Sequence, residues 1–192
     1  MLLFTDRAQL PDGRSLVHQV QRAVDGGPLV VVLRERDLED HERARLADAL
    51  VDLLEPVGGL LVSARPMIEG SHGVHLRRDD PVVRDRSGLV GRSCHDADEL
   101  TRARDERADY VTLSPVAPSA SKPGYGPALG STGLSALLAQ VPGAPAAYAL
   151  GGVEPSNAAQ WRACGAYGVA SMGAVMRASD PGAVVRRLAA PV

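Results

Sequence analysis

The feature that most constrains the fold is a pair of glycine-containing strand ends near the C-terminus. The apolar run 146–150 stops at Gly151-Gly152, and the run 169–171 is followed by Met172-Gly173. The start of a helix follows each run, with a proline suited to its first turn. Glycines at a strand end let the backbone come close to a ligand with its N–H groups exposed. Two successive strand ends of this kind, with room for a short extra helix after the second, predict the phosphate site of a (β/α)8 barrel.

The preceding sequence supplies the earlier units that such a barrel needs, because short apolar runs alternate with segments of helical spacing. The predicted strands span residues 2–5, 29–33, 59–63, 74–76, 88–91, 109–113, 146–150 and 169–171. The predicted helices span residues 15–25, 37–55, 96–107, 131–139, 156–164 and 181–188. We therefore expect an α/β fold of the TIM (β/α)8 barrel type. A doubly wound open sheet is the alternative, because periodicity alone does not show closure.

The chain of 192 residues is short for a TIM barrel. Only brief connections follow the third and fourth strands, around Met67-Ile68 and Asp79-Asp80-Pro81. Trimmed units 3 and 4 therefore explain the compact length. No linker or shift in composition interrupts the sequence, so we expect residues 1–192 to form a single barrel domain.

Composition excludes several classes of function. The net charge of −2 and the aromatic content of 3% argue against a nucleic-acid-binding protein. No apolar run approaches the length of a membrane span, and no targeting segment is evident at the N-terminus. Cys94 and Cys164 lack the spacing of a metal site or a disulfide. We expect a cytoplasmic protein without nucleic-acid or membrane partners.

Polar residues at the predicted strand ends are the candidates for function, because active sites of such barrels lie there. The candidates are Arg34, Glu35, Arg36, Ser63, Arg65, Arg77, Arg78, Asp79, Asp80, Arg92, Ser93, His95, Ser114, Ser119, Ser121 and Lys122. Several cations converge on one rim of an acidic protein. Together with the glycines, they predict a site for a phosphorylated anion.

Each candidate also has a purely structural interpretation. Arg34 and Glu35 could form an ion pair at the rim. His95 could cap the helix that follows it, and Asp80 could be an ordinary acidic residue at a helix start. Lys122 could be a surface lysine of a loop. The glycine-containing strand ends are the strongest of these signals for a ligand.

A series of motifs in the second half of the chain points to a known family. The motifs are Gly91-Arg92-Ser93-Cys94-His95, Ala108-Asp109-Tyr110-Val111, the segment 114–122, Leu150-Gly151-Gly152-Val153 and the segment 165–172. In order and spacing they resemble the thiamine phosphate synthase/TenI family, and the resemblance extends over nearly the whole chain. It implies a (β/α)8 barrel and a thiazole phosphate ligand. The implied phosphate site consists of Gly151, Gly152, Ser171, Met172 and Gly173.

The synthase branch of this family joins a pyrimidine diphosphate to the thiazole phosphate and uses Mg²⁺. Its strand-two pattern Gln-x-Arg-x-Lys corresponds here to Val32-Leu33-Arg34-Glu35-Arg36, and its Asn-Asp-Asp region corresponds to Ser63-Ala64-Arg65. Asp80 matches the remaining metal carboxylate, and Ser119-x-Ser121-Lys122 matches the Thr-x-Thr-Lys loop. A single carboxylate beside arginines is a poor Mg²⁺ site.

The TenI branch is an isomerase that makes the thiazole aromatic by proton transfer and needs no metal. Arg34-Glu35-Arg36, Arg65 and Gly91-Arg92-Ser93-x-His95 resemble this branch. The histidine that transfers the proton in its characterised members corresponds here to Pro115. We therefore predict that Glu35 or His95 moves the proton, since either could lie within hydrogen-bond reach of a ligand.

Three functions remain open, and we expect the thiazole tautomerase because the missing metal and pyrimidine residues outweigh the retained loop. The alternatives are a divergent synthase with Mg²⁺ on Asp80 and a non-catalytic phosphate-ligand binding protein. The tautomerase would require no cofactor, and a homodimer is one open oligomeric state. The predicted catalytic residues are Arg34, Glu35, His95 and Lys122. The predicted substrate-binding residues outside the glycine segments are Arg36, Arg65, Ser93, Ser119 and Ser121.

Overall fold

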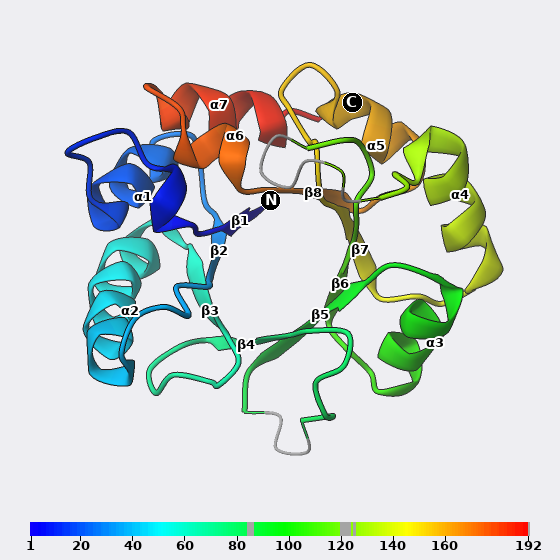
Figure 1. Cartoon of the computed structure of the whole chain (residues 1–192), viewed down its shortest axis with the longest axis horizontal. Helices are drawn as coiled ribbons and strands as arrows, with labels where there is room; N and C mark the ends of the chain where they lie inside the picture. Colours follow the sequence, from blue (N-terminus) through cyan, green and yellow to red (C-terminus); the bar gives the residue numbers. More distant parts are fainter. Residues whose placement is uncertain (84–86, 120–123, 125, 192) are drawn as a thin grey trace.

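The eight parallel strands form a closed barrel in the order in which they occur in the sequence (Figure 1). This computed structural model describes residues 1–83, 87–119, 124 and 126–191. The strands are β1 Leu2–Phe4, β2 Val30–Leu33, β3 Leu60–Ala64, β4 Gly73–Leu76, β5 Leu89–Cys94, β6 Tyr110–Leu113, β7 Ala146–Ala149 and β8 Gly168–Ser171. Pairing of Leu2 with Ala170 and of Leu3 with Ser171 joins β1 to β8. The predicted TIM barrel is thus confirmed, and the open-sheet alternative is wrong.

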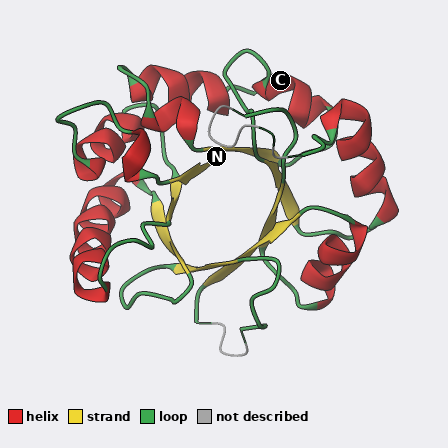
Figure 2. Cartoon of the chain, viewed as in Figure 1, coloured by secondary structure: helices red, strands yellow, loops and turns green. Residues whose placement is uncertain are grey.

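Helices surround the barrel on its outer side (Figure 2). They are α1 Leu16–Val24, α2 Asp40–Leu54, α3 Ala97–Asp105, α4 Gly130–Gln140, α5 Ala158–Ala163, α6 Gly173–Met176 and α7 Pro181–Ala189, with short 3-10 helices η1 Arg7–Gln9 and η2 Glu55–Val57. The described residues between β3 and β4, and between β4 and β5, contain no helix. This confirms the trimmed units 3 and 4 and accounts for the short chain.

Two predicted boundaries differ from the structure for clear physical reasons. The helix predicted from residue 37 begins at Asp40, because Glu39 and Glu42 form a reciprocal capping box and the Asp37 carboxylate accepts a hydrogen bond from Arg7 at 2.6 Å. The strand predicted for 88–91 continues to Cys94, because its later residues pair with β6. Ser93 therefore lies within a strand and not in a loop.

A series of aromatic rings in contact with one another runs through the interior of the barrel, beside aliphatic side chains such as Val32 and Val62. The ring centroids of Phe4 and His75 lie 5.0 Å apart, those of His75 and Tyr110 lie 5.6 Å apart, and Tyr110 lies 6.0 Å from Tyr148. Tyr148 in turn contacts Tyr167, which is 71% exposed just before β8. This aromatic row includes the only phenylalanine and three of the four tyrosines of the chain. Large side chains of this kind pack the interior of a closed barrel, so that it is a solid core and not a pore.

The position of Tyr110 depends on the glycine at position 91 of the neighbouring strand. A Cβ atom placed on Gly91 would lie 2.1 Å from Cζ and 2.4 Å from the hydroxyl oxygen of Tyr110. Both are far below normal contact distance. Gly91, part of the motif that carries the family resemblance, therefore makes room for the buried tyrosine ring.

We expect Gly91→Ala to lower the free energy of unfolding by about 1–3 kcal/mol, because the added methyl group overpacks the barrel interior. Denaturant unfolding would measure the change. Gly133→Ala is the matched control: its Cβ would lie 3.4 Å from Leu129 within α4, so alanine should stabilise the helix by about 0.5–1 kcal/mol. Equal effects of the two substitutions would contradict this account of Gly91.

Candidate active site

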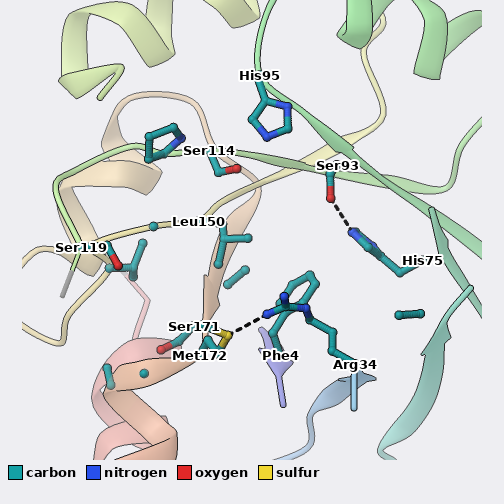
Figure 3. Close-up of a pocket in the computed structure, with 18 of the residues that line it drawn as sticks. Phe4, Arg34, His75, Ser93, His95, Ser114, Ser119, Leu150, Ser171 and Met172 are labelled. Atoms are coloured by element: carbon teal, nitrogen blue, oxygen red, sulfur yellow. Dashed lines mark hydrogen bonds between the residues drawn. The ribbon is translucent and has the colours of Figure 1, made fainter. Parts of the chain in front are cut away.

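A cavity of about 460 Å³ opens at the C-terminal ends of the strands (Figure 3). Every strand, or the segment directly after it, contributes to its wall. Examples in order of the strands are Phe4, Arg34, Ala64, His75, Ser93, Ser114, Leu150 and Ser171. The cavity thus lies at the end of the barrel where active sites of this fold occur.

The segments after β7 and β8 form a cup on one side of this cavity, made of Gly151, Gly152, Ser171, Met172 and Gly173. Ser171 is 2% exposed, and its Oγ has no hydrogen-bond partner among the described residues. A buried hydroxyl group without a hydrogen-bond partner lowers stability, so a polar atom of a ligand is the expected partner of this oxygen. These properties support the predicted phosphate site, which we call the glycine cup.

The glycines of the cup also have a packing role. Gly151 and Gly152 adopt φ values of 90° and 65°, which favour glycine. A Cβ on Gly152 would lie 2.4 Å from the carbonyl oxygen of Pro118 and 2.7 Å from Cβ of Ala117. The close approach is therefore to the segment after β6, as well as to the cavity. The sequence pattern predicted only a ligand-binding role for these glycines.

Arginines give the cavity a positive wall. Arg34 and Arg36 follow β2, and Arg77 and Arg78 follow β4. Arg34 lies beside the glycine cup, because its Nη1 is 2.9 Å from Sδ of Met172 (Figure 3). Among the described residues, neither Arg36 nor Arg77 has a side-chain hydrogen bond or ion pair. Since β4 lies opposite β8 in the barrel order, the cavity has cationic groups on both sides.

Arg92 holds the segment that carries Arg77 and Arg78. Its side chain is 1% exposed, and Nη1 donates to the carbonyl oxygens of Arg77, Arg78 and Asp80 at 2.8, 3.1 and 3.0 Å. Its Nη2 pairs with Glu106 of the α3 C-cap at 2.6 Å. A buried charge is tolerated when it is paired and hydrogen-bonded in this way. Arg92 thus shapes the positive wall without lining the cavity.

His75 is a cavity residue that the sequence analysis did not identify. It is 4% exposed, and its two ring nitrogens lie 3.1 Å from the Tyr110 hydroxyl and 2.9 Å from Ser93 Oγ. Burial, followed by the charges of Arg34 and Arg92, lowers the pKa of His75 to about 3. A histidine within the apolar strand 74–76 was the signal available in the sequence.

Glu35 and Arg65, two of the predicted site residues, do not line the cavity. Glu35 is 5% exposed, and its Oε2 pairs with Nε of Arg7 at 3.1 Å. The Arg65 side chain donates instead to the carbonyl oxygen of Pro81 at 3.3 Å. The geometry therefore gives Glu35 an ion pair at the base of the β1 and β2 loops, and no position for proton transfer to a ligand.

Other predicted residues do lie at the cavity. His95 lines it, and Nδ1 of its ring is 2.8 Å from Oε2 of Glu99, which also accepts the backbone N–H of His95. Ser93, Ser119 and Arg36 line it as well. The predicted residues Ser121 and Lys122 lie outside the described residues, so their roles stay predictions.

The carboxylates after β4 do not form a Mg²⁺ site. Asp80 does not line the cavity, and its Oδ2 accepts the backbone N–H of Arg77 at 2.7 Å. Asp79 does line it, but it pairs with Arg78 at 3.1 Å. No group of three or more His, Cys, Asp or Glu able to hold a metal occurs within the described parts of the chain. One oxygen of each carboxylate is thus engaged by a neighbouring donor, and a single carboxylate at the cavity fits a Mg²⁺ site poorly.

We expect Gly152→Ala to destabilise the protein more than Gly143→Ala. Both glycines have positive φ, so each substitution costs about 1–2 kcal/mol of backbone strain. Only Gly152 would also place a Cβ against a neighbour, which adds about 1–3 kcal/mol, whereas the space around Gly143 is open. Thermal and denaturant unfolding would compare the variants. Equal losses of stability would show that the contact with the segment after β6 is unimportant.

The low pKa of His75 predicts a pH dependence of stability. The unfolded chain protonates this side chain below its ordinary pKa of about 6.5, while the folded protein keeps it neutral down to about 3. The contribution of neutral His75 to the free energy of unfolding is therefore complete above about pH 6.5, and it declines as the pH falls below that value. Between pH 6 and 5 the slope should approach about 1.4 kcal/mol per pH unit. His75→Gln should remove this slope in denaturant titrations, and identical slopes would refute the prediction.

Comparison with known proteins gives a consistent result. Residues 1–175 match the family described as thiamine monophosphate synthase. A putative thiamine-phosphate synthase of Geobacter sulfurreducens is 35% identical over 99% of this chain and 92% of its own length. The thiamine-phosphate synthase of Syntrophomonas wolfei is 34% identical over 98% of this chain and 93% of its own length.

Among solved structures, a thiamine phosphate pyrophosphorylase of Pyrococcus furiosus superimposes with a TM-score of 0.83 at 23% identity, covering 97% of this chain and 92% of the other. That likeness supports the fold. The family match covers most of the chain, and parts of four of the motifs line the cavity, at Ser93 and His95, at Ser114 and Pro115, at residues 150–153, and at Ser171 and Met172. The chain therefore belongs to the thiamine monophosphate synthase family, the thiamine phosphate synthase/TenI family of the sequence analysis.

Proposed function

We propose that this protein is a thiamine-phosphate synthase, which joins hydroxymethylpyrimidine diphosphate to thiazole phosphate. Its relatives at 33–35% identity over nearly the full chain are named as synthases. The observation that carries the proposal is the shape and charge of the cavity. It has the glycine cup at one side and arginines at both sides, an arrangement suited to two phosphorylated substrates.

The tautomerase preferred in the sequence analysis is not supported by these comparisons. Of the two predicted proton carriers, Glu35 is engaged with Arg7 away from the cavity. His95 remains at the cavity, held by Glu99. Pro115, at the position of the tautomerase histidine, lines the cavity without a group that can transfer a proton.

The proposed reaction transfers the pyrimidine, through its methylene carbon, from the diphosphate to the thiazole. The bond between the methylene carbon of the pyrimidine and a diphosphate oxygen breaks as that carbon bonds to the thiazole. Negative charge accumulates on the departing diphosphate. The side chains of Arg36 and Arg77, which line the cavity and have no hydrogen-bond or ion-pair partner among the described residues, would neutralise that charge, and the glycine cup would bind the phosphate of the thiazole. Preorganised cations of this kind stabilise the developing charge without a rearrangement of the active site during the reaction.

Magnesium, which the synthase branch uses, would supply further neutralisation of the diphosphate when bound. The carboxylates after β4 are already engaged, so we derive no step through the metal. The partners that follow from the proposal are small molecules. No helix within the described residues is long and apolar enough to span a membrane. The cytoplasmic location, the single domain and the homodimer stay predictions.

An assay for thiamine phosphate formation from both substrates, with Mg²⁺ and with a chelator, tests the proposal. We expect product, with a smaller Mg²⁺ effect than a two-carboxylate site would give. Ligand binding without product would identify the binding-only alternative. Conversion of the non-aromatic thiazole isomer to the aromatic form, without condensation, would identify a tautomerase.

We expect Arg36→Gln and Arg77→Gln each to lower kcat/KM for condensation by about 10- to 100-fold, because each removes a charge-assisted contact to the diphosphate. Arg45→Gln is the matched control, since Arg45 is an exposed residue of α2 away from the cavity. Its kcat/KM should match that of the unsubstituted protein. Full activity in Arg36→Gln and Arg77→Gln would refute the role of the positive wall.

A further inference from the structure

Three hydrogen-bonded side chains, which we call the row as distinct from the aromatic row, lead from the barrel interior to the cavity. The Tyr110 hydroxyl lies 3.1 Å from Nδ1 of His75, and Nε2 of His75 lies 2.9 Å from Oγ of Ser93 (Figure 3). The three residues belong to the adjacent strands β4, β5 and β6. Ser93 and His75 line the cavity, whereas Tyr110 is buried beneath them. The row therefore connects a closed interior with the place where substrates bind.

The direction of the bond between Tyr110 and His75 follows from burial. The Tyr110 hydroxyl keeps its proton, because burial raises the pKa of the phenol far above its usual value. Its only hydrogen-bond partner among the described residues is His75. If Nδ1 carried a proton, the phenol proton would be buried without an acceptor, which is the costly case. Tyr110 therefore donates to an unprotonated Nδ1.

The charge state of His75 follows from its surroundings. Arg34 approaches from the end of β2 and Arg92 from β5, and both oppose a second positive charge. The ring of Phe4, from β1, packs against the imidazole in a T-shaped arrangement with ring centroids 5.0 Å apart. These contacts hold the imidazole neutral, so it carries one proton only. With Nδ1 accepting from Tyr110, that proton must be on Nε2.

We propose that Tyr110 and His75 act together as positioning residues that fix Ser93 as a hydrogen-bond donor to the substrate. Nε2–H of His75 donates to Ser93 Oγ, and the hydroxyl proton of Ser93 is thereby directed into the cavity. Its partner must be a hydrogen-bond acceptor, and an anionic oxygen of a phosphate group is a strong one. The identity of that substrate atom rests on the proposed function, whereas the direction of the row does not.

Nitrogen-15 NMR of the histidine side chains tests the direction of the row without any substrate. We expect the His75 signals to show a protonated Nε2 and an unprotonated Nδ1, unchanged from pH 8 to pH 5. His75→Gln identifies these signals among those of the five histidines. A proton on Nδ1, or titration of His75 within this range, would overturn the proposal. Because no turnover is needed, this outcome is independent of whether the chain is a synthase.

Tyr110→Phe removes the hydroxyl and keeps the ring. We expect both neutral tautomers of His75 to appear in the spectrum, because nothing then holds Nδ1 unprotonated. Tyr148→Phe is the matched control: Tyr148 belongs to the same aromatic row but has no hydrogen bond to a described side chain, so the tautomer should not change. Unchanged His75 signals in Tyr110→Phe would overturn the role of the phenol. Thermal unfolding of each variant confirms that it is folded.

A double-mutant cycle tests the link to the substrate. Ser93→Ala should lower kcat/KM for condensation by about 10- to 100-fold, the range for a hydrogen bond to a charged group. Tyr110→Phe should lower it less, and should have no further effect when Ser93 is already alanine. Additive effects would show that Tyr110 acts on stability or on another residue, and would overturn the positioning role. If the chain forms no product, the NMR result alone decides the proposal.

Discussion

The hydrogen-bonded closure between β1 and β8 is the constraint on which the site depends. It brings the first strand of the chain beside the last, so that Arg34 after β2 comes within 2.9 Å of Met172 after β8. Because all the strands are parallel, closure arranges their C-terminal ends around one rim. Without it, the glycine cup after β7 and β8 and Arg34 after β2 would lie near opposite edges of an open sheet. The cavity is a consequence of that single strand pairing.

Buried positive charge is the second organising feature of the molecule. The Nη1 and Nη2 groups of Arg92 donate to three carbonyl oxygens and to Glu106, and these bonds fix the backbone that carries Arg77. Burial is the main cause of the lowered pKa of His75, and the charges of Arg34 and Arg92 lower it further. One buried guanidinium thus acts on the backbone and on the protonation of a cavity residue. A hydrophobic residue of similar size would do neither.

Small and large residues in the barrel are matched in pairs. Gly91 leaves space for Tyr110, and Gly152 leaves space for the segment that contains Ala117 and Pro118. In the first case the result is a phenol placed below His75. In the second it is a loop after β6 packed against the glycine cup. The motifs that carry the family resemblance therefore encode packing as much as direct contact with a ligand.

The sequence by itself determined the barrel, its shortened units and the glycine cup. Each of these leaves a local signal: an apolar run, a missing helical period, or glycines directly after a strand. It also indicated that arginines gather at the rim. The choice among those polar residues needed the tertiary structure, because adjacent residues of a strand face opposite sides. Glu35 turns to Arg7, while Arg34 and Arg36 line the cavity. The row formed by His75, Ser93 and Tyr110 joins three strands across a span of 35 positions, so no local pattern revealed it. Only the lateral pairing of strands in a closed barrel brings those side chains within hydrogen-bond distance.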